Sequence, residues 1–273
     1  MKKAISLILA LLLSASVISL SACSSTEETE APTEETTEAP TEETTEAPIE
    51  EEEENKVKNA MIFGDSYSTF AGYVPENFIC FYSENERIET DVTKVEQTWW
   101  YQVMEETGMN LVQNNSWSAS SIGYTGYNGA DTSETHSFIF RLRNLINEGF
   151  FEENKIDVVF LFGGTNDSWS GAPLGEMKEY GDIVEDDLYN ALPAMCYFTA
   201  LLRETLPDAK IYCLINTGLK SEITNALSEL SDKHGMTPIK FENITKFFDH
   251  PTIVGMTQIK DQIMAVISEE EEK

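Results

Sequence analysis

The segment from Ile156 to Phe162 constrains the fold more than any other part of this 273-residue chain. Apart from Asp157 it is wholly apolar, and it is followed by Gly163 and Gly164. The strands of a parallel sheet are covered on both faces, so they read as continuous apolar runs rather than as alternating ones. This segment therefore predicts a central parallel strand.

Strand-like and helix-like segments alternate on both sides of this run. We expect strands near residues 60–63, 110–113, 210–215 and 238–241, and helices near residues 98–107, 137–148, 186–206, 222–234 and 252–267. Such alternation predicts one α/β domain with a doubly wound, mostly parallel sheet between two layers of helices. Functional sites in such sheets form at the carboxyl ends of the strands.

The folded domain is expected over residues 55–273, after two segments of different character. Residues 1–22 place Lys2 and Lys3 before an apolar run, as in a signal peptide. Residues 23–54 are rich in Thr, Glu and Pro and offer no apolar face that could pack, which predicts a disordered linker.

The four residues that end at Cys23 (Leu, Ser, Ala, Cys) resemble the lipobox of bacterial lipoproteins. This resemblance implies that the Cys23 thiol is lipidated and that the domain is extracellular, anchored to the bacterial cell membrane. Two acyl chains are enough for stable anchoring. An ordinary signal peptide that happens to contain a cysteine is the alternative.

The net charge of −30 excludes one class of partner. A chain this acidic repels polyanions, so nucleic-acid binding is not expected. Of the negative charges, 14 lie in residues 24–54, and the rest of the chain is acidic to a degree that is ordinary for a soluble surface. No Cys or His spacing suggests a metal site, and no cofactor is expected. The oligomeric state stays open, as does any pairing of Cys80, Cys196 and Cys213.

Three polar motifs follow the first three predicted strands: Gly64-Asp65-Ser66, Asn114 to Ser118, and Gly163 to Asp167. A Ser at a strand-to-helix turn can expose its hydroxyl, and nearby backbone N–H groups and an Asn amide can hold an oxyanion. A Ser nucleophile also needs a base, for which the chain offers His136, His234 and His250.

From about Ala60 to Ile267, these segments together resemble the SGNH hydrolase superfamily, also called GDSL esterases. Block one of that family matches Gly64-Asp65-Ser66, block three matches Gly164 to Asp167, and the final block matches His250-Pro251-Thr252. The resemblance implies the three-layer SGNH or flavodoxin-like fold, an esterase activity and no cofactor.

By this resemblance Ser66 attacks an ester carbonyl and His250 takes its proton. The implied oxyanion hole consists of the backbone N–H groups of Ser66 and Ser116 and the side-chain amide of Asn166. Ser116 stands where the family has a glycine, which is the first departure from the family pattern.

The second departure concerns the acid of the catalytic triad. The family has an acid three residues before its histidine, and that position is Phe247 here. Asp249 is the candidate for orienting the imidazole of His250, and a backbone carbonyl is the alternative.

Trp117 and Trp169 follow the second and third motifs. Either could stack on a sugar ring at the rim of the site, and packing of loop against loop is the alternative. The connection from Tyr67 to Glu96 is long and rich in Tyr and Phe, so we expect it to cover part of the pocket and to influence the choice of substrate.

The sequence thus predicts an extracellular serine esterase that hydrolyses O-acyl esters, with O-acetyl groups on a polysaccharide as the expected substrate. Its rate should rise with pH near the ordinary histidine pKa of about 6.5. Two alternatives stay open. One is a glycan-binding surface lipoprotein with weak or no turnover, motivated by Phe247 and Ser116, and the other is a lipase or thioesterase of the same fold.

Overall fold

The computed structural model of this chain describes residues 57–272. The signal peptide, Cys23 and the linker expected over residues 1–54 lie outside the described residues. Within residues 57–272, no helix combines the length and the apolar character that crossing a membrane requires.

Five parallel strands form the central sheet in the order β2-β1-β3-β4-β5. The strands are β1 (Asn59–Gly64), β2 (Asn110–Ser116), β3 (Val158–Phe162), β4 (Lys210–Ile215) and β5 (Thr237–Lys240). Strand β3 pairs with both β1 and β4, as its continuous apolar run predicts. The winding direction reverses between β1 and β3, which is where such folds form their sites.

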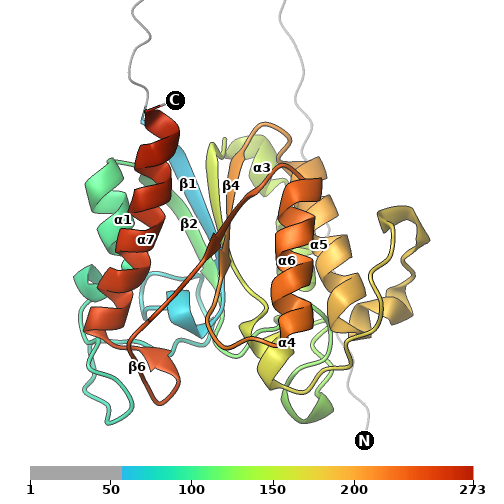
Figure 1. Cartoon of the computed structure of the whole chain (residues 1–273), viewed down its shortest axis with the longest axis horizontal. Helices are drawn as coiled ribbons and strands as arrows, with labels where there is room; N and C mark the ends of the chain where they lie inside the picture. The colour runs from blue at the N-terminus through green and yellow to red at the C-terminus, as the bar shows by residue number, and fades with distance from the viewer. Residues whose placement is uncertain (1–56, 273) are drawn as a thin grey trace, which may run out of the picture. The chain divides into compact units, whose positions relative to one another are not determined.

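Helices cover both faces of the sheet, so the three-layer doubly wound prediction is confirmed (Figure 1). Helices α1 and α7 lie on one side, and α2, α5 and α6 lie on the other. Their bounds are α1 Trp99–Thr107, α2 Phe138–Asn147, α5 Ala191–Thr205, α6 Ser221–Lys233 and α7 Ile253–Glu271; two shorter helices are α3 Phe150–Glu153 and α4 Thr165–Trp169.

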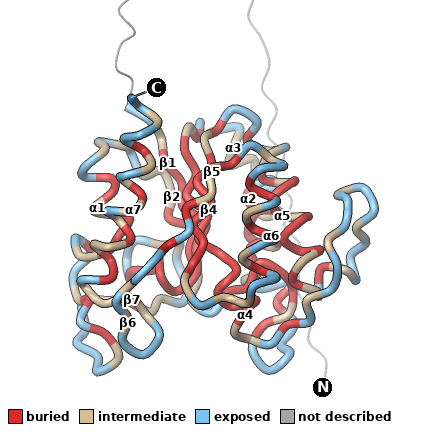
Figure 2. Tube along the Cα trace, viewed as in Figure 1, coloured by how far each residue is buried: buried red, intermediate tan, exposed pale blue. Residues whose placement is uncertain are grey.

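Strand β3 is apolar throughout because both of its faces are buried, and the central strands are red in Figure 2. In β1, Ala60 and Ile62 belong to the core shared with α1 and α7. Met61 and Phe63 belong to the core shared with α2, α5 and α6. The four apolar residues of β1 thus bury apolar surface on both faces of the sheet, which is the main favourable contribution to folding.

The helix predicted over residues 186–206 is two elements. A 3₁₀ helix spans Glu185–Tyr189, and α5 begins only after Asn190. Pro193 is the third residue of α5, where a backbone N–H has no partner within the helix, so the proline costs no hydrogen bond there.

Two further differences bear on the site. Strand β2 runs to Ser116 and therefore includes the first half of the second polar motif. His250, expected in a loop, lies in a small antiparallel hairpin of β6 (Lys246–Phe247) and β7 (His250–Pro251), immediately before α7. His250 thus lies in a hairpin with a defined backbone geometry.

Candidate active site

Ser66 lies just beyond the carboxyl end of β1, at the start of a 3₁₀ helix over Ser66–Ser68. The Asp65 carboxylate caps this helix by accepting a hydrogen bond from the Tyr67 N–H at 3.0 Å. Gly64 permits the close approach of β1 and β2, because a Cβ there would collide with the Ser116 hydroxyl and lie 2.7 Å from the Ser68 Cβ. Ser66 therefore lies at the carboxyl ends of the strands, where the site was expected.

The structure brings Ser66 and His250 together although they are 184 residues apart in the chain. The Ser66 Oγ lies 2.9 Å from the Nε2 of His250, which is hydrogen-bond distance. The other ring nitrogen, Nδ1, lies 2.9 Å from the carbonyl oxygen of Phe248. A carbonyl can only accept, so Nδ1 carries the proton of the neutral ring and Nε2 is free to accept the Ser66 proton.

Asp249 does not take the place of the triad acid. The Nδ1 of His250 is occupied by the Phe248 carbonyl, and Asp249 is exposed at the second position of the hairpin turn. The expectation that the Asp249 carboxylate orients the imidazole is therefore corrected, and the backbone-carbonyl alternative describes the geometry. The reason is the tightness of the two-residue turn, which puts a main-chain oxygen against the ring.

That turn has an unusual backbone for its sequence. Phe248 and Asp249 have φ values of 44° and 60°, as a type I′ hairpin turn requires at both central positions. Asn, Asp and Gly usually fill such positions, because a left-handed conformation costs other residues, such as Phe248, about 1–2 kcal/mol. Strain of this kind persists only where surrounding contacts hold it in place.

The connection that follows Ser66 supplies part of those contacts. The phenyl ring of Phe81 stacks on the His250 imidazole with 3.6 Å between centroids and 4° between planes. The expectation that residues 67–96 cover part of the site agrees with this contact.

Burial is the largest influence on the base, and it lowers the pKa of His250 below its ordinary value of 6.5. The Phe248 carbonyl and the Asp249 charge oppose this shift, whereas the charges of Lys246 and Arg87 add to it. The imidazole is therefore neutral, and able to act as a base, at neutral pH.

Asn166 lies in the first turn of α4, which follows Gly164 at φ +88°. Its amide Nδ2 donates to the carbonyl of Ser120 at 2.8 Å, and its Oδ1 accepts from the hydroxyl of Tyr127 at 3.0 Å. An amide nitrogen has two hydrogens, so one remains available for an oxyanion. Within residues 57–272 the backbone N–H of Ser66 also has no hydrogen-bond partner.

The third donor was expected to be the backbone N–H of Ser116; the structure corrects this expectation, and Ala119 is the candidate in its place. Ser116 is the last residue of β2, and the N–H of the next residue, Trp117, donates to Gly64 of β1. Because successive backbone N–H groups of a strand point to opposite sides, the Ser116 N–H points away from β1 and Ser66. Ala119, three residues later, is exposed, has φ +64°, and has a backbone N–H without a partner in the described part of the chain. Non-glycine residues in this conformation cluster at functional sites. The signal in the sequence is the run of small residues Ser118-Ala119-Ser120.

Arg141 supports the loops around the site, and the sequence analysis made no prediction for it. It is buried in α2 and donates to the Gly64 carbonyl at 3.2 Å, to the Ser120 hydroxyl at 3.1 Å and to the Asn115 side chain at 2.6 Å. It thereby joins the ends of β1 and β2 to the turn that carries Ala119. Burial lowers the pKa of Arg141 to about 9. The missed signal is a charged residue within the apolar stripe of a helix.

Two buried carboxyl groups support the same region. Asp167 accepts from the backbone N–H groups of Ile122 at 2.9 Å and Gly123 at 3.1 Å, which holds the loop after β2 against α4. Burial raises the pKa of Asp167 to about 6 and that of Asp65 to about 7. Because Asp65 titrates near neutral pH, it couples the stability of the fold to pH.

A cavity of about 500 Å³ adjoins the catalytic pair. Asp249 on its wall precedes His250, and Tyr127 on its wall is bonded to Asn166. The full lining is Tyr127, Trp169, Thr217, Gly218, Lys246 and Asp249. Trp169 therefore lies where a substrate beside Ser66 could meet it.

Trp117 does not line this cavity. Its ring packs against Phe78 at 4.4 Å and His136 at 5.5 Å between centroids, and it lines a separate cavity of about 200 Å³. The loop-packing alternative is therefore correct for Trp117, because the second motif continues as strand β2 and directs this side chain to other loops.

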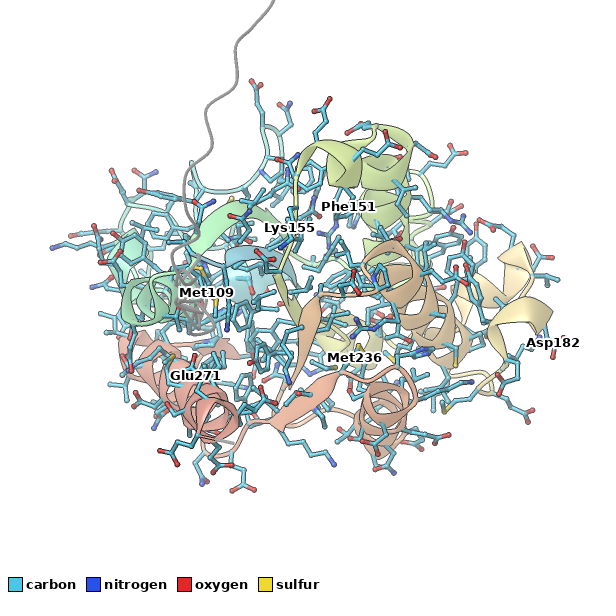
Figure 3. All side chains as sticks on the ribbon, turned by 90° about the horizontal axis from the view of Figure 1, so that it is seen from above. Met109, Phe151, Lys155, Asp182, Met236 and Glu271 are labelled. Atoms are coloured by element: carbon cyan, nitrogen blue, oxygen red, sulfur yellow. The ribbon has the colours of Figure 1, made fainter. Side chains whose placement is uncertain are left out.

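The opposite end of the sheet has a cavity of about 430 Å³, to which Met109, Lys155 and Glu271 contribute (Figure 3). It lies at the amino ends of β1, β3 and β4, away from Ser66. In residues 57–272, no group of three or more His, Cys, Asp or Glu side chains could hold a metal ion. Cys80, Cys196 and Cys213 form no disulfide bond with one another in the part of the chain that the structure describes.

Comparison with known proteins agrees with this geometry. Residues 58–267 match the family described as GDSL-like Lipase/Acylhydrolase. The chain belongs to this family. As a GDSL-like lipase/acylhydrolase it is a carboxylic ester hydrolase of the SGNH superfamily, so the expected family and enzyme class are confirmed.

Two solved structures of provisionally assigned GDSL-like lipases resemble this GDSL-like domain. The protein from Bacteroides ovatus ATCC 8483 is 39% identical with a TM-score of 0.72, and the match covers 78% of this chain and 99% of the other. The protein from Bacteroides uniformis ATCC 8492 is 41% identical with a TM-score of 0.72, covering 78% and 97%. No functionally curated protein matches.

A more distant structure shares the fold alone. The family two carbohydrate esterase from Cellvibrio japonicus is 13% identical with a TM-score of 0.51. The match covers 78% of this GDSL-like chain and 61% of the esterase.

Proposed function

We propose that this domain hydrolyses O-acyl esters, with acetyl groups on a glycan as the substrate, through a Ser66–His250 dyad. The observation that carries the proposal is the 2.9 Å distance between the Ser66 Oγ and the His250 Nε2. The unpartnered N–H groups of Ser66 and Ala119 add the donors that an ester carbonyl needs.

In the first half of the reaction, the Ser66 Oγ bonds to the ester carbonyl carbon while its proton passes to the Nε2 of His250. The negative charge on the carbonyl oxygen is held by the N–H groups of Ser66 and Ala119 and by the Asn166 amide. When the C–O bond to the alcohol breaks, Nε2 returns the proton to the leaving oxygen. Water then repeats the sequence on the acyl-enzyme and releases the acid.

The cavity beside the dyad supports a sugar rather than a lipid chain. Trp169 and Tyr127 supply aromatic rings on which a sugar could stack. Lys246 and Asp249 supply a donor and an acceptor for sugar hydroxyls, and they would lose hydration without compensation against a hydrocarbon chain. These features favour a polar substrate of ring size within about 500 Å³.

The experiment is a substrate panel with released product as the readout. Purified domain is incubated with acetylated xylan, acetylated glucomannan, p-nitrophenyl palmitate and acetyl-coenzyme A, beside the Ser66→Ala variant. We expect acetate release from at least one glycan by the unaltered protein and none by the variant. Trp169→Leu should lower kcat/KM for that glycan relative to kcat/KM for p-nitrophenyl acetate by about tenfold, on the order of 1.4 kcal/mol.

The other outcomes separate the remaining functions. Faster turnover of the palmitate ester would indicate a lipase, and turnover of the thioester would indicate a thioesterase. Glycan binding by both proteins without acetate release would indicate a binding protein. The dyad geometry argues against this last function. Phe247 stands where the family has its acid, and the Phe248 carbonyl contacts the Nδ1 of His250 in place of that acid.

A further inference from the structure

We infer that the hydroxyl groups of Tyr67 and Tyr82 position His250 by holding the strained hairpin around it, a task that a triad acid would otherwise perform. The inference rests on the proposed function, since it assigns the device that keeps the base of that reaction in place. Both residues are positioning residues, because each acts through the backbone beside His250.

The imidazole ring of His250 is held through its Nδ1. Nδ1 has one partner within residues 57–272, the carbonyl oxygen of Phe248 at 2.9 Å. No carboxylate contacts this nitrogen in that part of the chain, so the direction of the ring depends on where the Phe248 carbonyl points. That carbonyl belongs to a turn whose two central residues, Phe248 and Asp249, both have left-handed backbones.

The turn formed by Phe248 and Asp249 does not keep this conformation by itself. Type I′ turns are stable when Asn, Asp or Gly occupies the positive-φ positions, and phenylalanine is not suited to either. The hairpin itself is two residues long on each side. Its geometry therefore depends on contacts from other parts of the chain.

Two tyrosine hydroxyls supply such contacts on both sides of His250. The Tyr67 hydroxyl donates to the carbonyl oxygen of Asp249, the residue before His250. The Tyr82 hydroxyl donates to the carbonyl oxygen of Pro251, the residue after it, at 3.1 Å. Both tyrosines are completely buried. Burial raises the pKa of each far above neutral pH, so both hydroxyls keep the proton that they donate.

The same two residues also frame the imidazole. Tyr67 directly follows the nucleophile Ser66, and its ring centroid lies 5.4 Å from that of His250. Tyr82 directly follows Phe81, whose ring stacks on the imidazole. One short stretch of chain thus carries the nucleophile, the ring that covers the base and both hydroxyls that hold the hairpin. The contacts of this stretch with the hairpin therefore help to fix the distance between Ser66 and His250.

The experiment combines kinetics with the protonation of the ring. Tyr67→Phe, Tyr82→Phe and the double variant each lose only hydroxyl oxygens. With p-nitrophenyl acetate we expect kcat to fall about tenfold in each single variant and about a hundredfold in the double variant, with KM within twofold. Nitrogen-15 NMR of the histidine side chains reports which ring nitrogen is protonated, and His250→Gln identifies the His250 signals among the three histidines.

We expect the unaltered protein to show the Nδ1-protonated ring and the double variant to show a mixture of both tautomers. Tyr212→Phe is the matched control. It removes a buried phenol hydroxyl that donates to Glu270 at 2.9 Å at the far end of the sheet, so it reports the cost of losing such a bond away from His250. Melting temperatures of all variants separate loss of fold from loss of position.

The outcomes are distinct for this inference and for the proposed function. A double variant that keeps both kcat and the Nδ1-protonated ring overturns the inference, as does a loss of kcat matched by Tyr212→Phe at equal melting temperature. If the unaltered protein lacks esterase activity but the double variant still changes the tautomer, the positioning role stands and the proposed function fails.

Discussion

The phenyl ring of Phe81 lies face to face with the imidazole of His250, 3.6 Å away and within 4° of parallel. This stack keeps water from one face of the base, and burial is the largest cause of its lowered pKa. Phe81→Leu should therefore raise the pKa of His250 toward 6.5 and move the acid limb of the kcat/KM profile to higher pH. A series of rates between about pH 4.5 and 8 measures this.

Phe151→Leu is the control for this prediction, since Phe151 is a half-buried ring at the opposite end of the molecule (Figure 3). Its profile should coincide with that of the unaltered protein. An acid limb that does not move in Phe81→Leu would show that the stack does not govern the pKa of His250.

The unaltered enzyme should keep its activity to a lower pH than an exposed histidine would allow. Neutral imidazole is the active form, and a folded-state pKa below 6.5 means that the ring stays neutral at a lower pH than an exposed histidine. We expect kcat/KM to be constant above pH 6.5 and to fall below it, with a midpoint lower than that value. A midpoint at or above 6.5, or a profile that stays flat down to the pH at which the protein unfolds, would contradict the role of His250.

Asp65 should make the fold less stable as pH rises. Its pKa is raised from 3.8 to about 7, so its contribution is fully present below pH 3.8 and is lost as pH rises through about 7. The free energy of unfolding in urea should therefore fall on the order of 2 kcal/mol between about pH 5 and 8 from this group. Asp65→Asn should remove that loss.

Asp167 has a raised pKa of about 6 and adds a smaller loss in the same direction, which remains in the Asp65→Asn variant. Asp208→Asn, at an exposed carboxyl group, should leave the pH dependence as it is. Equal slopes of stability against pH in Asp65→Asn and the unaltered protein would contradict the prediction.

Asn166→Ala should lower kcat about a hundredfold, because one oxyanion donor contributes roughly 3 kcal/mol to the transition state. Tyr127→Phe should lower kcat less, by about three- to tenfold. This variant removes only the hydroxyl that donates to the Oδ1 of Asn166 at 3.0 Å, and the Asn166 amide stays in place. Stopped-time assays with p-nitrophenyl acetate measure both. Asn154→Ala removes an amide at the far end of the molecule, so a loss of kcat there equal to that of Asn166→Ala would count against the donor role.

Strands β1, β3 and β4 were predictable because burial on both faces requires a continuous run of apolar residues. Strand β4 has the predicted bounds, Lys210 to Ile215, since each of its residues after the first is buried. Ser66, Asn166 and His250 were predictable from motifs that resemble those of one family. Their proximity was not, because local patterns carry no information on contacts between residues 184 positions apart.

The rest of the site depends on conformations that the residue types disfavour. Phe248-Asp249 is not one of the residue pairs, such as Asn-Gly or Asp-Gly, that predict a type I′ turn. Alanine at position 119 likewise does not predict a left-handed backbone. Tertiary contacts impose both, so neither the hairpin under His250 nor the third donor was anticipated. Arg141 was overlooked because helical periodicity treats a charge in an apolar stripe as an interruption.

The most direct test of the account is the rate of p-nitrophenyl acetate hydrolysis by Ser66→Ala beside Ser68→Ala. Ser68 is a buried serine two residues further along the same short helix, and its hydroxyl has no partner within residues 57–272. We expect kcat to fall by more than about a thousandfold in Ser66→Ala and by less than about threefold in Ser68→Ala. Equal rates for Ser66→Ala and the unaltered protein would contradict the account, because ester hydrolysis would then proceed without the hydroxyl on which it is built.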